Sequence, residues 1–197
     1  MNRGLLAPIA VALAFPAFAG AQGTTTEIAT GDNFFNPEKV SSDVGVESFF
    51  WQWGPPVSSG EHNVSEVGGI FSSGSPETSG SLTVTPSAGT FLYVCDVHGF
   101  VNGDNVIGMG GEIAVKPTAT PQGKKALITW ATETTDTGTK FDVEQKIGSK
   151  KPELVEEKTK AIEGAFKLKG GTKYEFRVRS RIGKATSEFS PKLKLKG

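Results

Sequence analysis

Four residues of the types that bind soft metal ions are present in the middle of the chain. Cys95 is the sole cysteine, His98 follows three positions later, and Met109 is the sole methionine besides Met1. His62 is the other of the two histidines. Two imidazoles, a thiolate and a weak thioether form the ligand set of blue-copper electron-transfer sites. The chain contains that set once, with nothing left over.

Other chemistries for Cys95 and His98 match the composition less well. A lone cysteine at a strand end is often a small buried hydrophobic residue. Cysteine and histidine also bind zinc, but structural zinc sites usually have four N or S ligands, and only three strong ones exist here. A nucleophilic Cys/His pair needs a third, orienting group, and none is evident. A dinuclear copper centre needs two cysteines, and multicopper sites need many histidines, so the counts exclude both.

Short strands must position these residues, because the N-terminal half shows no convincing helical periodicity. Cys95 stands near the end of one strand, and His98 is expected across a turn from it. His62 opens another strand, and Met109 directly precedes the last one. Several short strands with regular turn signals predict a β-sandwich or barrel. The predicted strands are ESFFWQW (47–53), EHNVSEV (61–67), GSLTVTP (80–86), TFLYVCDV (90–97) and GEIAV (111–115).

The C-terminal half also alternates apolar and polar residues. In KYEFRVRSR (173–181), Tyr174, Phe176 and Val178 alternate with charged residues, which predicts a half-buried strand. ALITWAT (126–132), KFDVEQKIG (140–148) and SPKLKLKG (190–197) show related patterns, with Trp130 at an expected core position. About 80 residues of this kind suit a seven-strand sandwich.

The distribution of charge divides the chain into two modules. Residues 22–117 contain 11 acidic and two basic residues, a net charge of −9. Residues 118–197 contain 18 basic and 10 acidic residues, a net charge of +8. Such an asymmetry favours two domains. We predict domains at 22–116 and 124–197, joined by a Pro- and Thr-containing linker at 117–123.

The N-terminus has the features of an export signal. Arg3 precedes an apolar stretch, and small residues suit cleavage after Ala19 or Ala21. Residues 1–21 are therefore predicted to be a signal peptide, with an uncleaved anchor as the alternative. No later segment is apolar enough to span a membrane. Export implies a secreted, periplasmic or cell-surface protein, in which an unpaired cysteine needs burial or a bound partner. Nucleic acid is not an expected partner there.

Residues 24–115 resemble the plastocyanin/azurin-like blue copper proteins, the cupredoxins. The likeness rests on NFFNP (33–37), the aromatic strand ending in Trp53, the run His62-Asn63-Val64, SGSLTVTPSAGTFLYVCDVH (79–98) and MGGEIAV (109–115). The resemblance implies a Greek-key β-sandwich holding one type 1 copper ion that cycles between Cu(I) and Cu(II). His62, Cys95 and His98 would be the equatorial ligands and Met109 the axial one. Asn63 would tie the His62 strand to the Cys95 loop.

The segment between His98 and Met109 departs from that family. It has ten residues, GFVNGDNVIG, where relatives have only a few. We expect a loop inserted at the mouth of the metal site, so Asp104 or a backbone carbonyl is an alternative axial ligand. An oxygen there would lower the copper potential. Phe100 and Val101 in this segment are candidates for docking a redox partner.

Residues 118–197 resemble a fibronectin type III domain, an immunoglobulin-like sandwich. The Trp130 strand, the Tyr174 strand and the SEFSP turn (187–191) carry this likeness. Basic runs there, including Lys150-Lys151 and the arginines of 177–181, would form a solvated face or bind an anionic surface polymer. The whole chain is thus expected to be an all-β, exported copper electron carrier and not an enzyme. The alternative is a surface-attached protein for copper capture or adhesion.

Overall fold

The computed structural model describes residues 23–103, 105–135 and 139–197; the predicted signal peptide (1–21) and Asp104 lie outside them. Within these ranges the secondary structure is strand without helix, so no described helix could cross a membrane. The all-β prediction is confirmed for this part of the chain. The strands of the N-terminal half are β1 (Thr24–Thr30), β2 (Phe35–Asn36), β3 (Lys39–Asp43), β4 (Glu47–Trp53), β5 (Ser65–Glu66), β6 (Gly80–Val84), β7 (Gly89–Asn102) and β8 (Asn105–Lys116). Those of the C-terminal half are β9 (Thr118–Gln122), β10 (Lys125–Thr129), β11 (Lys140–Ile147), β12 (Glu153–Thr159), β13 (Glu163–Lys167), β14 (Lys173–Ile182), β15 (Ala185–Thr186) and β16 (Leu193–Lys196).

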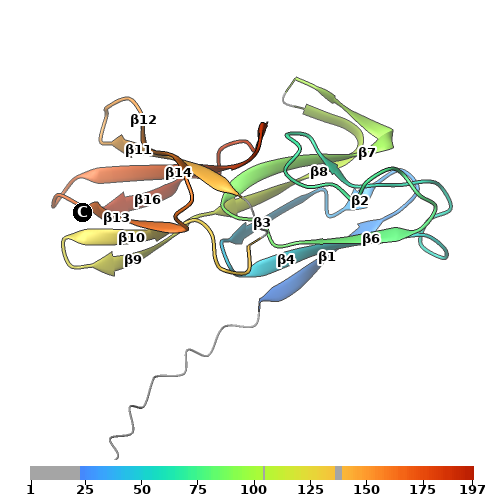
Figure 1. Ribbon diagram of the computed structural model, residues 1–197, viewed down its shortest axis with the longest axis horizontal. Coiled ribbons are helices and arrows are strands. Elements are labelled where there is room, and N and C mark those ends of the chain that lie inside the picture. The colour runs from blue at the N-terminus through green and yellow to red at the C-terminus, as the bar shows by residue number, and fades with distance from the viewer. Residues whose placement is uncertain (1–22, 104, 136–138) are drawn as a thin grey trace, which may run out of the picture.

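Two sheets enclose the core of the N-terminal half (Figure 1). One sheet has the strand order β2-β1-β4-β6, and the other has β3-β8-β7-β5. In β4 the side chains of Phe49, Trp51 and Trp53 are buried, whereas Gln52 between them is exposed. Successive side chains of a strand point to opposite faces, so this alternation places the aromatic rings between the sheets.

A second pair of sheets encloses a separate core in the C-terminal half. Strands β13, β10 and β9 form one sheet, and the other has the order β12-β11-β14-β15, with β16 also paired to β14. Trp130, Tyr174, Phe176 and Val178 all belong to this core, as their alternation predicted. The two halves lie end to end along the long axis of the molecule (Figure 1).

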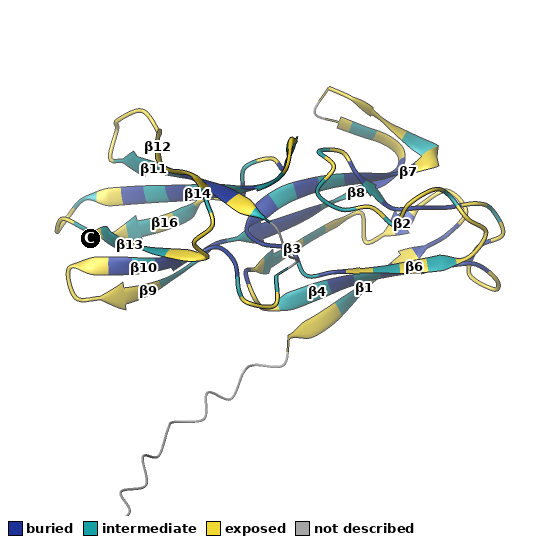
Figure 2. Cartoon of the chain, viewed as in Figure 1, coloured by how far each residue is buried: buried dark blue, intermediate teal, exposed yellow. Residues whose placement is uncertain are grey.

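Strands β7 and β8 form a long hairpin that projects beyond the N-terminal sandwich (Figure 1). The sequence predicted strand 90–97, a turn before His98 and a loop up to Met109. Instead, β7 continues through His98 to Asn102, and β8 already begins at Asn105. The pairing shifts register between Val94 and Gly99, which is a β-bulge. The expected loop insertion is therefore an extension of two paired strands, largely exposed in Figure 2.

The strand expected at 61–67 is much shorter than predicted. Only Ser65 and Glu66 form a strand, β5, which pairs with Val94 and Tyr93 of β7. His62 instead forms an isolated bridge with Glu77, in which each backbone N–H donates to the other residue's carbonyl. The backbone bonds of this segment are thus divided among β7, Glu77 and residues 71–73, so it does not form one continuous ladder.

The predicted linker, 117–123, contains strand β9, which pairs with β10 along its whole length. The two halves also touch directly. Thr90 of β7 forms a two-way backbone bridge with Glu188, and the Ala88 N–H donates to the carbonyl of Trp130 at 2.8 Å. The hydroxyls of Ser87 and Ser180 are hydrogen-bonded, and both residues are buried. The connection is therefore a packed interface between the two halves.

Candidate metal centre

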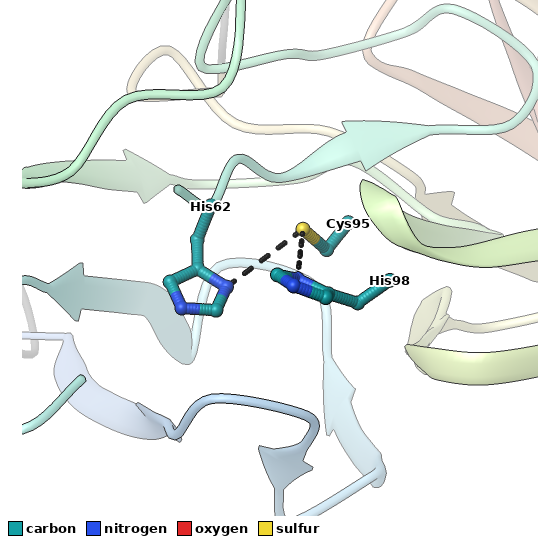
Figure 3. A group of neighbouring side chains, drawn as sticks. All are labelled: His62, Cys95 and His98. Carbon is teal, nitrogen blue, oxygen red and sulfur yellow. Dashed lines mark hydrogen bonds between the residues drawn. The ribbon is translucent and has the colours of Figure 1, made fainter. Parts of the chain in front are cut away.

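Three potential metal ligands, His62, Cys95 and His98, converge at one end of the N-terminal sandwich (Figure 3). Cys95 and His98 both belong to β7, and the bulge between Val94 and Gly99 lets both side chains reach the same point. His62 arrives from the segment bridged to Glu77. The ligand atoms of the three residues all lie within 4.8 Å of one another.

The distances between these donors suit a single metal ion. Cys95 Sγ lies 3.9 Å from His62 Nδ1 and 3.5 Å from His98 Nδ1. An ion bound at about 2.0–2.1 Å by nitrogen and about 2.3 Å by sulfur would separate those donors by roughly 3.6–3.8 Å. The observed distances bracket this range, and both rings present the same nitrogen, Nδ1, to the sulfur. The cluster can therefore bind a metal through one thiolate and two imidazoles.

The environment of the cluster favours neutral imidazole at His62. His62 and Cys95 are fully buried, whereas His98 is partly exposed. Burial lowers the pKa of His62 from its ordinary value, and the neighbouring His98 lowers it further. Only a neutral ring nitrogen can donate its lone pair to a metal. The site is thus poised to bind a metal at neutral pH, with His98 as its solvent-facing side.

Asn63 ties the His62 segment to the strand that carries the thiol. Its side-chain carbonyl accepts the backbone N–H of Asp96 at 2.8 Å. Its side-chain amide donates to the Asp96 carboxylate at 2.7 Å and to the Gly74 carbonyl at 2.8 Å. Because Asn63 is fully buried and directly follows His62, these bonds fix the spacing between His62 and Cys95.

Met109 lies across the hairpin from the bulge, since its neighbours Gly108 and Gly110 pair with Gly99 and Val94. Its side chain is buried in the same core as Cys95. Two glycines allow the strands to approach so closely here. A Cβ on Gly99 would lie 2.4 Å from the Met109 carbonyl oxygen. A Cβ on Gly108 would lie 2.4 Å from the His98 carbonyl oxygen, and Gly108 also has a φ of 80°. The segment that separates His98 from Met109 in sequence thus folds out as the hairpin arm.

The predicted docking residues Phe100 and Val101 lie on that arm, immediately beyond His98. Phe100 is 58% exposed and Val101 is 37% exposed. Sequence reasoning missed Ile107, which pairs with Phe100 across the hairpin and is 42% exposed. Ile107 was missed because a loop was expected there, whereas the strand pairing is what brings residues 100 and 107 side by side.

Asp32 is the further site residue that sequence reasoning missed. Its Oδ1 lies 3.9 Å from His62 Nε2, on the side of the ring away from the sulfur. Asp32 follows β1, 30 positions before His62, and no spacing pattern links the two residues. The nearby motif NFFNP begins at the next residue, and it gave no indication of a role for Asp32.

Comparison with known proteins finds no match to a family model and none to a curated protein sequence. Several solved structures resemble the fold in part. A two-domain fibronectin type III segment of chicken tenascin is 14% identical and covers 73% of this chain and 88% of its own, with a TM-score of 0.36. A cytokine receptor complex is 11% identical over 70% of this chain and 85% of that chain, with the same TM-score. A myokine structure is 18% identical over 42% of this chain and 93% of that chain, again at 0.36. Likenesses of this strength assign neither a family nor a function.

Proposed function

We propose that this protein is an exported type 1 copper protein that binds one copper ion and transfers single electrons without transforming a substrate. The observation that carries the proposal is the convergence of Cys95 Sγ with Nδ1 of both His62 and His98. One thiolate with two imidazoles is the equatorial set of a blue-copper site. Met109, buried in the same core, would be the weak axial ligand.

The donor set favours copper over zinc. A structural zinc site has four strong N or S ligands, and a catalytic one keeps a position open for water. Here three strong donors converge, and the proposed fourth is a thioether, which is a soft ligand suited to Cu(I). Met109 is 1% exposed, so its side chain belongs to the packed interior and not to a solvent channel.

The protein's own residues would hold the donors in place during electron transfer. When bound, copper supplies the Cu(I)/Cu(II) couple. Asn63 ties the His62 segment to Asp96 of the Cys95 strand through two hydrogen bonds and to Gly74 through a third, and Cys95 and Met109 lie in a buried core. Both features would resist rearrangement of the donors when the charge of the site changes. Partly exposed His98 would be the edge through which electrons pass.

We place the docking surface on the arm beside His98. Phe100, Val101 and Ile107 provide exposed apolar contact there. The N-terminal half has a net charge of −9, so a redox protein with a basic rim around its own contact patch would be attracted to this half of the molecule. We further propose that residues 1–21 direct export and are then removed, leaving a copper domain (22–116) and a C-terminal domain (124–197).

The optical spectrum of the copper-loaded protein tests this proposal. The full mature chain with one equivalent of Cu(II) should become intensely blue through sulfur-to-copper charge transfer, with one type 1 paramagnetic signal. Cys95→Ser should remove the colour while the circular dichroism stays that of a folded β protein. Ser65→Ala, a similarly small change two residues beyond Asn63, is the control and should remain blue. A colourless wild-type protein at full copper occupancy would refute the assignment.

One observation favours a second role for the C-terminal half, as a binding module for an anionic surface polymer. An open depression of about 690 Å³ is lined by Leu168 and Leu195 together with Lys124, Lys169 and Lys196. The arginines considered from the sequence are less suitable, because Arg177 pairs with Glu144, and Arg179 and Arg181 pair with Asp142.

Binding of the full chain to a sulfated polysaccharide column tests this second role. Lys169→Glu combined with Lys196→Glu should abolish retention at physiological salt. Lys160→Glu combined with Lys140→Glu makes the same change of charge on exposed lysines elsewhere, and it should not abolish retention. Equal loss in both double variants would mean that net charge, and not the depression, causes binding.

A further inference from the structure

We infer that Asp32 is a positioning residue of the metal centre, which accepts the Nε2–H hydrogen bond of His62 and thereby stabilises Cu(II) relative to Cu(I). This inference rests on the proposed function, because it concerns the same copper site. Asp32 would be the acceptor for Nε2, the ring nitrogen of His62 that faces away from the metal.

The geometry of the cluster decides which ring nitrogen of His62 carries the proton. Nδ1 faces the sulfur of Cys95 at 3.9 Å, on the side where the three donors converge. A neutral imidazole that binds a metal through Nδ1 must carry its proton on Nε2. The metal-bound form of His62 therefore has an N–H group that points away from the metal.

The Nε2–H group of His62 needs a hydrogen-bond acceptor. His62 Nε2 is buried and has no hydrogen-bond partner within the described structure. Buried polar groups in native proteins are nearly always hydrogen-bonded, and an unpaired one usually has an explanation. Metal binding at Nδ1 makes an acceptor more important, because it makes the Nε2 proton more acidic and a better hydrogen-bond donor.

Asp32 is placed to be that acceptor. Asp32 Oδ1 lies 3.9 Å from Nε2, and among the carboxylates of the described residues it alone lies within 4.0 Å of that atom. Asp32 is held in place by the Ser59 backbone N–H, which donates to Oδ1 at 2.6 Å, and by the Ser59 hydroxyl. Ser59 begins the short segment that leads into His62. The contact between Ser59 and Asp32 thus positions both the Asp32 carboxylate and the backbone segment that leads to His62.

The 3.9 Å distance between His62 Nε2 and Asp32 Oδ1 is about 1 Å longer than that of an ordinary N–H···O hydrogen bond. A small rotation of the Asp32 side chain, which is more than half exposed, would close it while Oδ2 takes over the contact with the Ser59 hydroxyl. A carboxylate acceptor fixes the orientation of a ligand imidazole and raises its basicity. The higher basicity, together with the negative charge of the carboxylate, stabilises the more highly charged Cu(II), so the reduction potential falls.

Asp32→Asn tests the inference, because it removes the charge with little change in shape. Loss of such a partner typically lowers metal affinity by 10- to 100-fold. We expect Cu(II) affinity to fall within that range with Cu(I) affinity much less changed. The reduction potential should rise by about 59 mV for each tenfold difference between the two losses. Glu61→Gln is the matched control: it removes an exposed carboxylate adjacent to His62 in sequence, and it should show neither effect.

A second measurement does not depend on the redox behaviour. In the diamagnetic Cu(I) protein with ¹⁵N-labelled histidine, the His62 Nε2 proton should be visible, slow to exchange and shifted downfield. Asp32→Ala should make it exchange rapidly, whereas Glu61→Gln, which alters an exposed carboxylate outside this contact, should leave it protected.

The outcomes separate this inference from the proposed function. A blue wild-type protein in which Asp32→Asn and Glu61→Gln have the same affinity and potential would overturn the role of Asp32 alone. So would an Nε2 proton that is equally protected in Asp32→Ala. A wild-type protein that binds Cu(II) without colour would refute the type 1 site itself.

Discussion

Thr90 and Glu188 form a two-way backbone bridge between the two halves of the molecule. The Thr90 N–H donates to the Glu188 carbonyl at 3.1 Å, and the Glu188 N–H donates back at 3.0 Å. The Thr90 hydroxyl adds a bond to the Phe189 carbonyl at 3.0 Å. Thr90 lies on β7, the strand that carries Cys95 and His98. The C-terminal half therefore supports the strand on which the metal site is built.

Weakening this interface should destabilise the whole chain. Ser180 is fully buried, and its hydroxyl contacts the Ser87 hydroxyl and the Ala88 carbonyl. Ser180→Ala should lower the free energy of unfolding by about 1–3 kcal/mol, the usual cost of leaving a buried polar group unpaired. Urea denaturation followed by tryptophan fluorescence measures this. Exposed Ser81→Ala is the control, and equal stability of the two variants would contradict the prediction.

Asn63→Ala should affect both stability and metal binding. The substitution removes three hydrogen bonds that join the His62 segment to Asp96 and Gly74. We expect the free energy of unfolding to fall by about 1–3 kcal/mol. Copper affinity should fall by about 10- to 100-fold, because the spacing between His62 and Cys95 is no longer held. Competition with a copper chelator measures the affinity, and Asn102→Ala on the exposed arm should match the wild type. Unchanged affinity in Asn63→Ala would show that the clamp is dispensable.

Met109 substitutions should shift the potential in opposite directions. Met109→Gln introduces an oxygen donor, which favours Cu(II) and should lower the reduction potential. Met109→Leu removes a donor while conserving volume, so the potential should rise with little loss of stability. A shift of about 59 mV corresponds to a tenfold change in relative Cu(II) and Cu(I) affinity. Spectroelectrochemical titration distinguishes the variants, and identical potentials would mean that Met109 is not a ligand.

The metal-free protein should lose stability in mild acid because of His62. Burial lowers the pKa of His62 in the folded state below its ordinary value of 6.5. At a pH between the lowered pKa of the folded state and 6.5, His62 is protonated in the unfolded chain but not in the folded chain. Unfolding therefore becomes more favourable as pH falls below about 6.5. Urea denaturation from pH 7.5 to 5 should show a shallower pH slope in metal-free His62→Gln than in wild type. Parallel slopes would contradict the depressed pKa.

The fold class and the strands of each core were readable from local patterns. The 47–53 strand was predicted at its observed bounds, because Phe49, Trp51 and Trp53 recur with the period of a strand that buries one face. The same reasoning located 173–181, where Tyr174 and Phe176 alternate with charged residues. Local pattern was less informative at 117–123. A Pro- and Thr-containing segment forms an edge strand as readily as a linker, since Pro121 needs no ladder partner on the free side.

The sequence by itself determined the chemistry available to this protein: one thiol, two imidazoles and one internal thioether, which only a few kinds of metal site can use. Tertiary structure decided how those groups meet. The bulge that turns Cys95 and His98 toward one point depends on the register of β7 against β8. The approach of Asp32 to His62 depends on a contact between loops 30 positions apart. Residue types are local properties of the chain, whereas register and loop packing are set by the total free energy of the folded molecule, so no short stretch of sequence encodes them.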